Sequence, residues 1–211
     1  MVECYRIAPP RVRQYMEAEI SYILEHIKPG DAVLDLGCGF GRVMPDLARK
    51  AALVVGIDNS RASLTLAKDR LRRSPYCRLA RANALLLCFK PGSFDVTVCI
   101  QNGISAFHVD QKELLRESLR VTRPGGRVLF SSYSAKFWNH RLEWFYMQAD
   151  AGLLGEIDRE KTRDGVIACK DGFTATTVDR ERFLTLAAGL NAAAAVTEID
   201  DSSIFCELIP G

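Results

Sequence analysis

The first thirty residues carry apolar side chains at helical spacing. Their stripe consists of Val12, Met16, Ile20, Ile23 and Ile27. A spacing of three and four residues places these side chains on one face of a helix, and Pro29-Gly30 marks its end. The pattern therefore predicts one amphipathic helix, and we interpret residues 1–30 as a helical lid on the rest of the chain.

From residue 31 onward, short apolar runs alternate with segments of helical periodicity. The expected strands are 32–36, 53–57, 77–81, 94–100 and 128–132, and the expected helices are 40–49, 61–72 and 109–121. Strand followed by helix, repeated, is typical of parallel strands joined by right-handed crossovers. Residues 31–132 are thus predicted to form a parallel sheet covered by helices, with the apolar strands buried on both faces.

The pattern changes after residue 132. We expect an aromatic-rich helix over 136–149 and a hairpin of 166–170 with 173–178 around Asp171-Gly172. A last helix capped by Asp179 reaches about residue 189, and two strands, 193–199 and 203–209, turn at Asp200-Asp201. We interpret 133–178 as a substrate-side insertion and 179–211 as the closing part of a single domain.

Composition narrows the possible classes of protein. A chain of 211 residues with 48% hydrophobic content suits one buried core. The net charge of +2, without a long Lys/Arg run, makes nucleic acid an unlikely partner. No apolar stretch approaches the roughly 18 residues that span a bilayer, and the start does not resemble a signal peptide. We expect a cytoplasmic protein without membrane contact.

The seven cysteines indicate neither disulfides nor metal. They form no CxxC pair and are odd in number, whereas zinc sites and disulfide frameworks need paired thiols at short spacing. We expect reduced, mostly buried thiols and no metal ion.

The most informative segment is a glycine cluster at the end of the first strand. Gly37, Gly39 and Gly41 follow the strand and lead into a helix, so the backbone there can approach a ligand closely. Dinucleotide sites place a GxGxxG spacing at the same point, but the spacing here is GxGxG. Asp35 precedes it inside the strand. A carboxylate favours a cofactor with positive charge over one with pyrophosphate.

Five segments together resemble a known family. In order they are VLDLGCGFGR, VVGIDNS, RANALLL, FDVTVCIQNG and RVTRPGGRVLF, over residues 31–132. They resemble the motif series of class I S-adenosylmethionine-dependent methyltransferases, especially the small-molecule group. The resemblance implies a three-layer α/β/α Rossmann-like sandwich whose seven-stranded sheet is mostly parallel, with the last strand antiparallel. The implied cofactor is S-adenosyl-L-methionine, and the implied product is S-adenosyl-L-homocysteine.

The resemblance also implies a cofactor site. Asp58, at the end of the second strand, is expected to accept hydrogen bonds from both ribose hydroxyls. Asn83 stands near the adenine where the family usually has Asp. The methionine carboxylate needs a donor, which Arg42 or a residue of the first helix, such as Tyr15 or Arg11, is expected to supply. The complete expected set is Asp35, Gly37, Cys38, Gly39, Gly41, Arg42, Asp58, Asn59, Asn83, Ala84, Ile100, Gln101 and Tyr15.

The methyl acceptor is expected at the carboxyl ends of the strands, where open α/β sheets place their ligands. The candidate substrate residues are Asn102, Ser105, His108, Tyr133, Trp138 and Arg141, and the catalytic candidates among them are Asn102, His108 and Tyr133. Residues 101–104 lack the (N/D/S)PP(Y/F) motif of DNA-amino methyltransferases. The acceptor's identity, its nucleophilic atom (N, O or S) and the oligomeric state stay open.

The expected activity is methyl transfer by in-line displacement to a small molecule. Three alternatives stay open at this point. One is a regulatory module that binds S-adenosylmethionine without catalysis, and another is a protein or tRNA methyltransferase. The third, an NAD-dependent oxidoreductase, is disfavoured by the GxGxG spacing and by the lack of a Tyr-x-x-x-Lys pair in the expected region.

Overall fold

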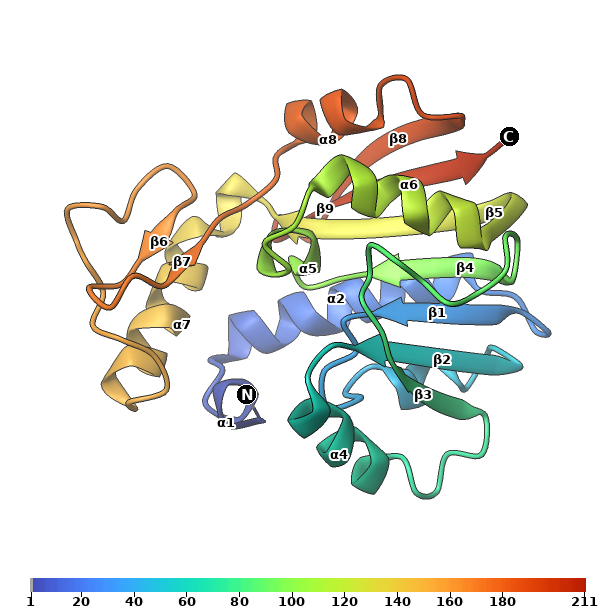
Figure 1. Cartoon of the computed structure of the whole chain (residues 1–211). Coiled ribbons are helices and arrows are strands. Elements are labelled where there is room, and N and C mark those ends of the chain that lie inside the picture. Colours follow the sequence, from blue (N-terminus) through green and yellow to red (C-terminus); the bar gives the residue numbers. More distant parts are fainter. Residues whose placement is uncertain (1) are drawn as a thin grey trace.

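The computed structural model describes residues 2–211, and a seven-stranded sheet forms its centre (Figure 1). The strands are β1 (Ala32–Leu36), β2 (Leu53–Asp58), β3 (Cys77–Arg81), β4 (Phe94–Cys99), β5 (Thr122–Tyr133), β8 (Ala192–Ile199) and β9 (Ser203–Pro210). They lie in the order β3-β2-β1-β4-β5-β9-β8. β9 pairs antiparallel with both neighbours, and the other pairs are parallel. The expected α/β fold, with its antiparallel last strand, is confirmed.

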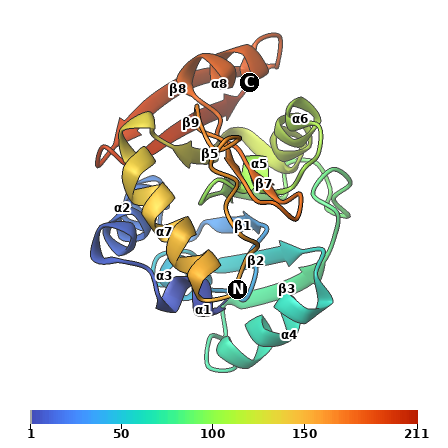
Figure 2. The same cartoon turned by 90° about the vertical axis from the view of Figure 1, so that its left-hand side faces the viewer.

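Helices cover both faces of the sheet (Figure 2). They are α1 (Val2–Arg6), α2 (Pro10–His26), α3 (Met44–Leu47), α4 (Arg61–Arg70), α5 (Gly103–Ala106), α6 (Gln111–Val121), a 3-10 turn (Ala135–Phe137), α7 (Trp138–Asp150) and α8 (Arg180–Ala187). Val33 packs in the apolar cluster with α2, α3 and α4, whereas Leu34 and Leu36 pack with α6 and α8. Successive residues of a strand face opposite sides, so this alternation produces the three layers. No helix within residues 2–211 has the length and apolar character that a bilayer crossing requires.

Several predicted elements have different bounds in the structure. The helix expected over 40–49 is wrong in length, because only α3 is helical. Gly41 has φ +72°, which a right-handed helix cannot contain, so helical structure begins only after the glycine turn. β5 begins at Thr122, directly after α6, and not at residue 128. α1 was not predicted.

The insertion forms a cap beyond the carboxyl ends of the parallel strands. It consists of α7 and the hairpin β6 (Ile167–Ala168) with β7 (Thr174–Ala175), on the left of Figure 1. The expected turn at Asp171-Gly172 is present, and the Phe173 N–H donates to the Asp171 carboxylate over 3.0 Å. Aromatic side chains of α7 and the first half of α2 form a third apolar cluster, separate from the two on the sheet.

Candidate functional site

A cavity of about 440 Å³ lies where the strands β1, β2 and β4 end. Most of the expected cofactor residues line it: Asp35, Gly37, Cys38, Gly39, Arg42, Asp58, Asn59, Asn83, Ala84, Ile100 and Gln101. Tyr5, Phe40 and Phe107 line it too, although the sequence analysis did not single them out. Carboxyl ends of parallel strands are the usual ligand-binding edge of such sheets, so this cavity is the candidate site.

The glycine turn forms the floor of the cavity. The N–H groups of Gly37 and Cys38 both donate to the Ile57 carbonyl over 2.9 Å, which fixes the turn to the end of β2. Gly37 has φ +74°, and a Cβ there would stand 2.5 Å from the Phe107 ring. Gly41 packs against Leu71 and does not line the cavity. Its expected role is therefore corrected from ligand contact to close packing of the turn on α4.

Asp58 stands beside this turn with its carboxylate held by the backbone. One oxygen accepts from the Gly39 N–H over 3.0 Å and the other accepts from the Ser60 N–H over 2.7 Å. Ser60 in turn caps α4 by accepting from the Ser63 N–H. A carboxylate has about four acceptor positions, so each oxygen keeps one for a ligand. The geometry suits a ligand with two neighbouring hydroxyl donors.

Asp35 and Arg42 place opposite charges at the next part of the cavity wall. Asp35 is 4% exposed. Burial raises the pKa of its carboxyl to about 7, Arg42 opposes the rise, and Asp58 adds to it. The Arg42 Nε and Nη2 atoms are buried without a hydrogen-bond partner in residues 2–211. Buried polar atoms are rarely left unpaired, so this guanidinium is placed to bind an anionic group of a ligand.

The segment after β4 is held in an unusual backbone conformation. Gln101 and Asn102 have φ +54° and +61°, a region that costs non-glycine residues energy. The Gln101 N–H lies 2.9 Å from both a Glu19 carboxylate oxygen and the Ser131 hydroxyl, and its side-chain carbonyl accepts from the Tyr5 hydroxyl over 3.1 Å. These contacts fix the strained turn at the rim of the cavity.

Glu19 is a further residue that the sequence analysis missed. It is fully buried in α2, where it accepts from Ser203 and from the Gln101 N–H. Burial raises the pKa of Glu19, and the hydrogen bonds from Ser203 and Ser131 limit the rise. A signal was present in the sequence: residue 19 falls on the apolar stripe between Met16 and Ile23, and an acid there needs buried partners.

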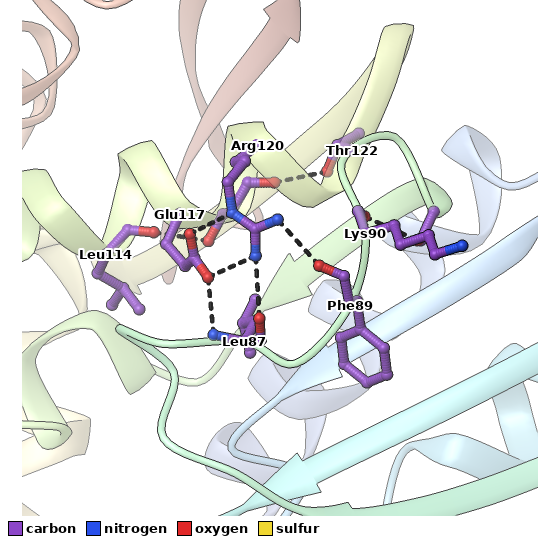
Figure 3. Close-up of polar contacts among 9 residues, drawn as sticks. Leu87, Phe89, Lys90, Leu114, Glu117, Arg120 and Thr122 are labelled. Carbon is purple, nitrogen blue, oxygen red and sulfur yellow. Dashed lines mark hydrogen bonds and ion pairs between the residues drawn. The ribbon is translucent and has the colours of Figure 1, made fainter.

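The opposite end of the cavity leads into a loop clamped by α6 (Figure 3). Asn83 and Ala84 line the cavity. Beyond them the Leu87 N–H donates to Glu117 over 2.7 Å, and Arg120 donates to the carbonyls of Phe89 and Leu87 over 2.9 and 3.0 Å. Charge-assisted bonds of this kind are the stronger ones. They hold the segment after β3 in place beside the cavity.

Four further expected residues lie outside the cavity or use their side chains elsewhere. Tyr15 is fully buried against Tyr133 and Phe137. Tyr5 lines the cavity where Tyr15 was expected. His108 is exposed and does not line the cavity, because the turn after α5 carries it outward. The Asn102 side-chain N–H donates to the Thr176 carbonyl, and its side-chain oxygen accepts from the Ser132 hydroxyl, each over 2.8 Å. Ser105 is buried in α5, apart from the cavity.

The remaining substrate candidates gather under the insertion. Trp138 is half-buried, while Tyr133 and Arg141 are buried at 8% and 1% exposure. Arg141 lies over the Tyr133 ring, 4.7 Å from its centroid. None of the three lines the cavity. Within residues 2–211, no three His, Cys, Asp or Glu side chains gather as a metal site.

Known proteins match this chain over its cavity-forming half. Residues 33–126 match the family model described as a methyltransferase domain. The demethylmenaquinone methyltransferase of Beutenbergia cavernae is 37% identical over 123 residues, 57% of this chain and 49% of that protein. The ubiquinone biosynthesis O-methyltransferase of Stutzerimonas stutzeri is 34% identical over 118 residues, 54% of this chain and 49% of that protein. The chain thus spans about half the length of these curated relatives.

A solved structure matches nearly the whole chain. A crystal structure of a Pyrococcus horikoshii protein has a TM-score of 0.72, with 20% identity, over 99% of both chains. At that identity the likeness concerns the fold, which includes the cap as well as the sheet. The family model matches the segment that carries the glycine turn, Asp58 and the end of β4. Residues 33–126 therefore resemble a methyltransferase domain, and the whole chain shares the fold of the solved structure.

Proposed function

We propose that this chain is an S-adenosylmethionine-dependent methyltransferase that acts on a small molecule. One observation carries the proposal: a single cavity combines the backbone-held carboxylate of Asp58, the buried carboxylate of Asp35 and the unpartnered guanidinium of Arg42. The cofactor combines a ribose diol, a cationic methionine part and a carboxylate. Each of these groups complements one of the three side chains: the diol can donate hydrogen bonds to Asp58, the cationic part is attracted by Asp35, and the carboxylate can pair with Arg42.

The order of groups along the cavity suits the cofactor from end to end. Asp58 accepts from the ribose hydroxyls, and Asn83 with Ala84 lies beside the adenine. Arg42, on whose far side the Tyr5 ring packs 5.1 Å away, binds the methionine carboxylate. Asp35 balances the positive charges. A pyrophosphate would gain little here, because α3 has only four residues and begins after the glycine turn.

The residues around the cavity act by positioning and by excluding water. S-adenosylmethionine supplies a methyl group on a positively charged sulfur; the acceptor forms a bond to that carbon as the C–S bond breaks, and the electron pair stays on sulfur. The protein must hold the reacting atoms in line. The fixed turn at Gln101 and the Tyr5 ring line the cavity on the proposed acceptor side, where they would help to keep water from the reacting centre.

The relatives' names support a small-molecule acceptor. One relative is named for demethylmenaquinone and another for ubiquinone biosynthesis. A quinone-type acceptor is therefore one member of the proposed class, although the matches cover only half of each relative. A net charge of +2 supports a chain without a nucleic-acid partner. We place the reaction in the cytoplasm as part of the same proposal.

Parallel calorimetric titrations with S-adenosylmethionine, S-adenosylhomocysteine and NAD test the proposal. We expect micromolar binding of the two adenosyl compounds and no binding of NAD. Formation of S-adenosylhomocysteine in the presence of an acceptor then separates an enzyme from a non-catalytic binding module. Binding of NAD alone would overturn the proposal.

A further inference from the structure

Arg141 is a buried cation that has no counter-ion among the described residues. Its Nη1 and Nη2 atoms donate to the carbonyls of Gly165 and Ala175 over 2.7 and 2.8 Å, and its Nε has no partner. The side chain is 1% exposed. Burial lowers the pKa of Arg141, and only Tyr133 and Tyr15 oppose the shift, with no carboxylate among the described residues contributing. A buried charge is costly unless a partner of opposite charge meets it.

Tyr15 adds a second unpaired donor at the same place. It is fully buried, and its hydroxyl makes no hydrogen bond within residues 2–211. Its ring lies 5.1 Å from the Tyr133 ring, on which Arg141 also packs. The Tyr133 hydroxyl contributes to a raised pKa of Tyr15, after burial and Glu19. The Tyr15 hydroxyl is therefore a buried donor that no described residue uses.

This cluster lies next to the end of the cavity where methyl transfer is proposed. Tyr133 is the last residue of β5, and the Ser131 hydroxyl, two residues earlier, lies 2.9 Å from the Gln101 N–H. Two residues of strand span about 7 Å. Asn83, at the adenine end, lies on the far side of β1 in the sheet order. The cluster is therefore on the acceptor side of the cofactor.

The α1 helix contacts both the cavity and α7. Tyr5 packs on Phe40 at the cavity and on Trp144 of α7, with ring centroids 5.5 and 6.2 Å apart. The Trp144 indole N–H donates to the Cys4 carbonyl over 2.9 Å. No residue of α1 is buried. An element with few buried contacts opens at far lower cost than the whole fold, so α1 can lift and join the two spaces.

We propose that Arg141 and the Tyr15–Tyr133 pair bind the acidic group of the methyl acceptor, and that the acceptor is an aromatic carboxylate admitted when α1 lifts. This inference rests on the proposed function. Arg141 Nε and one phenol offer two donors, which match the two oxygens of a carboxylate. The rings of Phe137, Trp138 and Phe145 surround the cluster and suit a flat apolar body.

Calorimetry on protein saturated with S-adenosylhomocysteine tests this inference. The probes are benzoate, 4-hydroxybenzoate and cinnamate, each paired with its neutral amide. We expect at least one carboxylate to bind about tenfold or more tightly than its amide, as for hydrogen bonds to a charged group. Tyr15→Phe keeps the ring and removes only the unpaired hydroxyl. It should weaken carboxylate binding about tenfold, leave S-adenosylhomocysteine affinity unchanged and not lower the melting temperature.

Tyr22→Phe is the matched control, because Tyr22 lies on the same helix and packs on Phe205; it should change none of these values. Arg141→Met serves as a second variant that removes the charge, with its fold checked by circular dichroism. The inference is overturned if every acid binds no better than its amide, or if Tyr15→Phe leaves carboxylate affinity unchanged. Failure to bind S-adenosylhomocysteine would instead overturn the proposed function, so the two failures are distinguishable.

Discussion

The two halves of the binding region are built in opposite ways. On the cofactor side, an open cavity of about 440 Å³ exposes carboxylates and a guanidinium whose hydrogen-bonding capacity is only partly used. On the acceptor side, aromatic side chains fill the space between α2, α7 and the β6–β7 hairpin. The proposed cofactor half is therefore already open in the structure, whereas the proposed acceptor half is filled with side chains.

Preformation has an energetic consequence. The cofactor half keeps charged groups buried before any ligand arrives, and Asp35 has a pKa of about 7 because of this burial. Functional sites often hold groups in positions that cost stability. The acceptor half instead gains stability from packed rings. Substitutions in the cofactor half should thus change cofactor affinity, and substitutions in the acceptor half should change how easily α1 opens.

The largest effect is expected from Gly39→Val, which should abolish cofactor binding. Gly39 lines the cavity at φ +54°, where a β-branched residue is strained and its side chain meets the ligand. Calorimetric titration with S-adenosylhomocysteine measures the loss. Gly125→Val is the matched control, because Gly125 also has positive φ but has open space around it. Equal loss in both variants would assign the effect to strain alone.

Asp35→Asn should raise the stability of the protein at about pH 8 and lower its affinity for the cofactor. The pKa of Asp35 is raised from 3.8 to about 7, so the folded state holds this proton more tightly than the unfolded state. The wild-type free energy of unfolding therefore loses a contribution on the order of 4 kcal/mol as pH rises from about 4 to about 7. The Asn variant lacks this loss and should be more stable than wild type at about pH 8.

Urea unfolding of both proteins across this pH range measures the difference, and Asp179→Asn, at an exposed helix cap, is the control. Parallel pH curves for wild type and Asp35→Asn would contradict the assigned pKa. Cofactor affinity of the Asn variant should fall, because a neutral amide no longer balances the cofactor's positive charges.

Asp58→Ala should weaken cofactor binding by about 2 kcal/mol, as for the loss of hydrogen bonds to a charged group. Titration with S-adenosylhomocysteine checks it. Asp110→Ala is the matched control, since Asp110 also accepts a backbone N–H at a helix start but lies outside the cavity. An unchanged affinity for Asp58→Ala would remove the ribose assignment and would weaken the contrast between the two halves.

The smallest effect is expected on the acceptor side. Trp144→Phe removes the hydrogen bond to the Cys4 carbonyl, so the opening of α1 should become easier by about 1 kcal/mol. Hydrogen exchange of the α1 amides measures this change, with cofactor affinity expected to be constant. Trp138→Phe, on the same helix, is the comparison variant. Slower or equal exchange in Trp144→Phe would show that this bond does not hold α1 closed.

Much of the cofactor half could be predicted because its signals are local. Gly37, Gly39 and Asp58 were placed correctly on the cavity wall, since a turn that needs positive φ and a carboxylate at a strand end can both be read within a few residues. The bounds of β3 matched the expected 77–81. Their roles toward the cofactor are still predictions that the titrations above decide.

The acceptor half resisted prediction because its contacts join distant parts of the chain. Tyr15 and His108 were expected at a ligand, yet one is packed between rings and the other is exposed. Tyr5 reaches Gln101 across 96 residues, and Glu19 reaches it across 82. No residue spacing in the sequence indicates these long-range contacts. The side-chain roles there depend on how α1, α2 and α7 pack.

The sequence by itself determined the order of strands and helices, the glycine turn with its two flanking acids, and the antiparallel closure at Asp200-Asp201. These features follow from periodicity and from backbone conformations that few residues adopt. Only the tertiary structure decided that two nitrogen atoms of Arg42 are buried without a hydrogen-bond partner, and that Arg141 is buried with no carboxylate beside it among the described residues. Burial depends on how distant segments pack, so the sequence alone does not show which charged side chains are buried or what lies beside them.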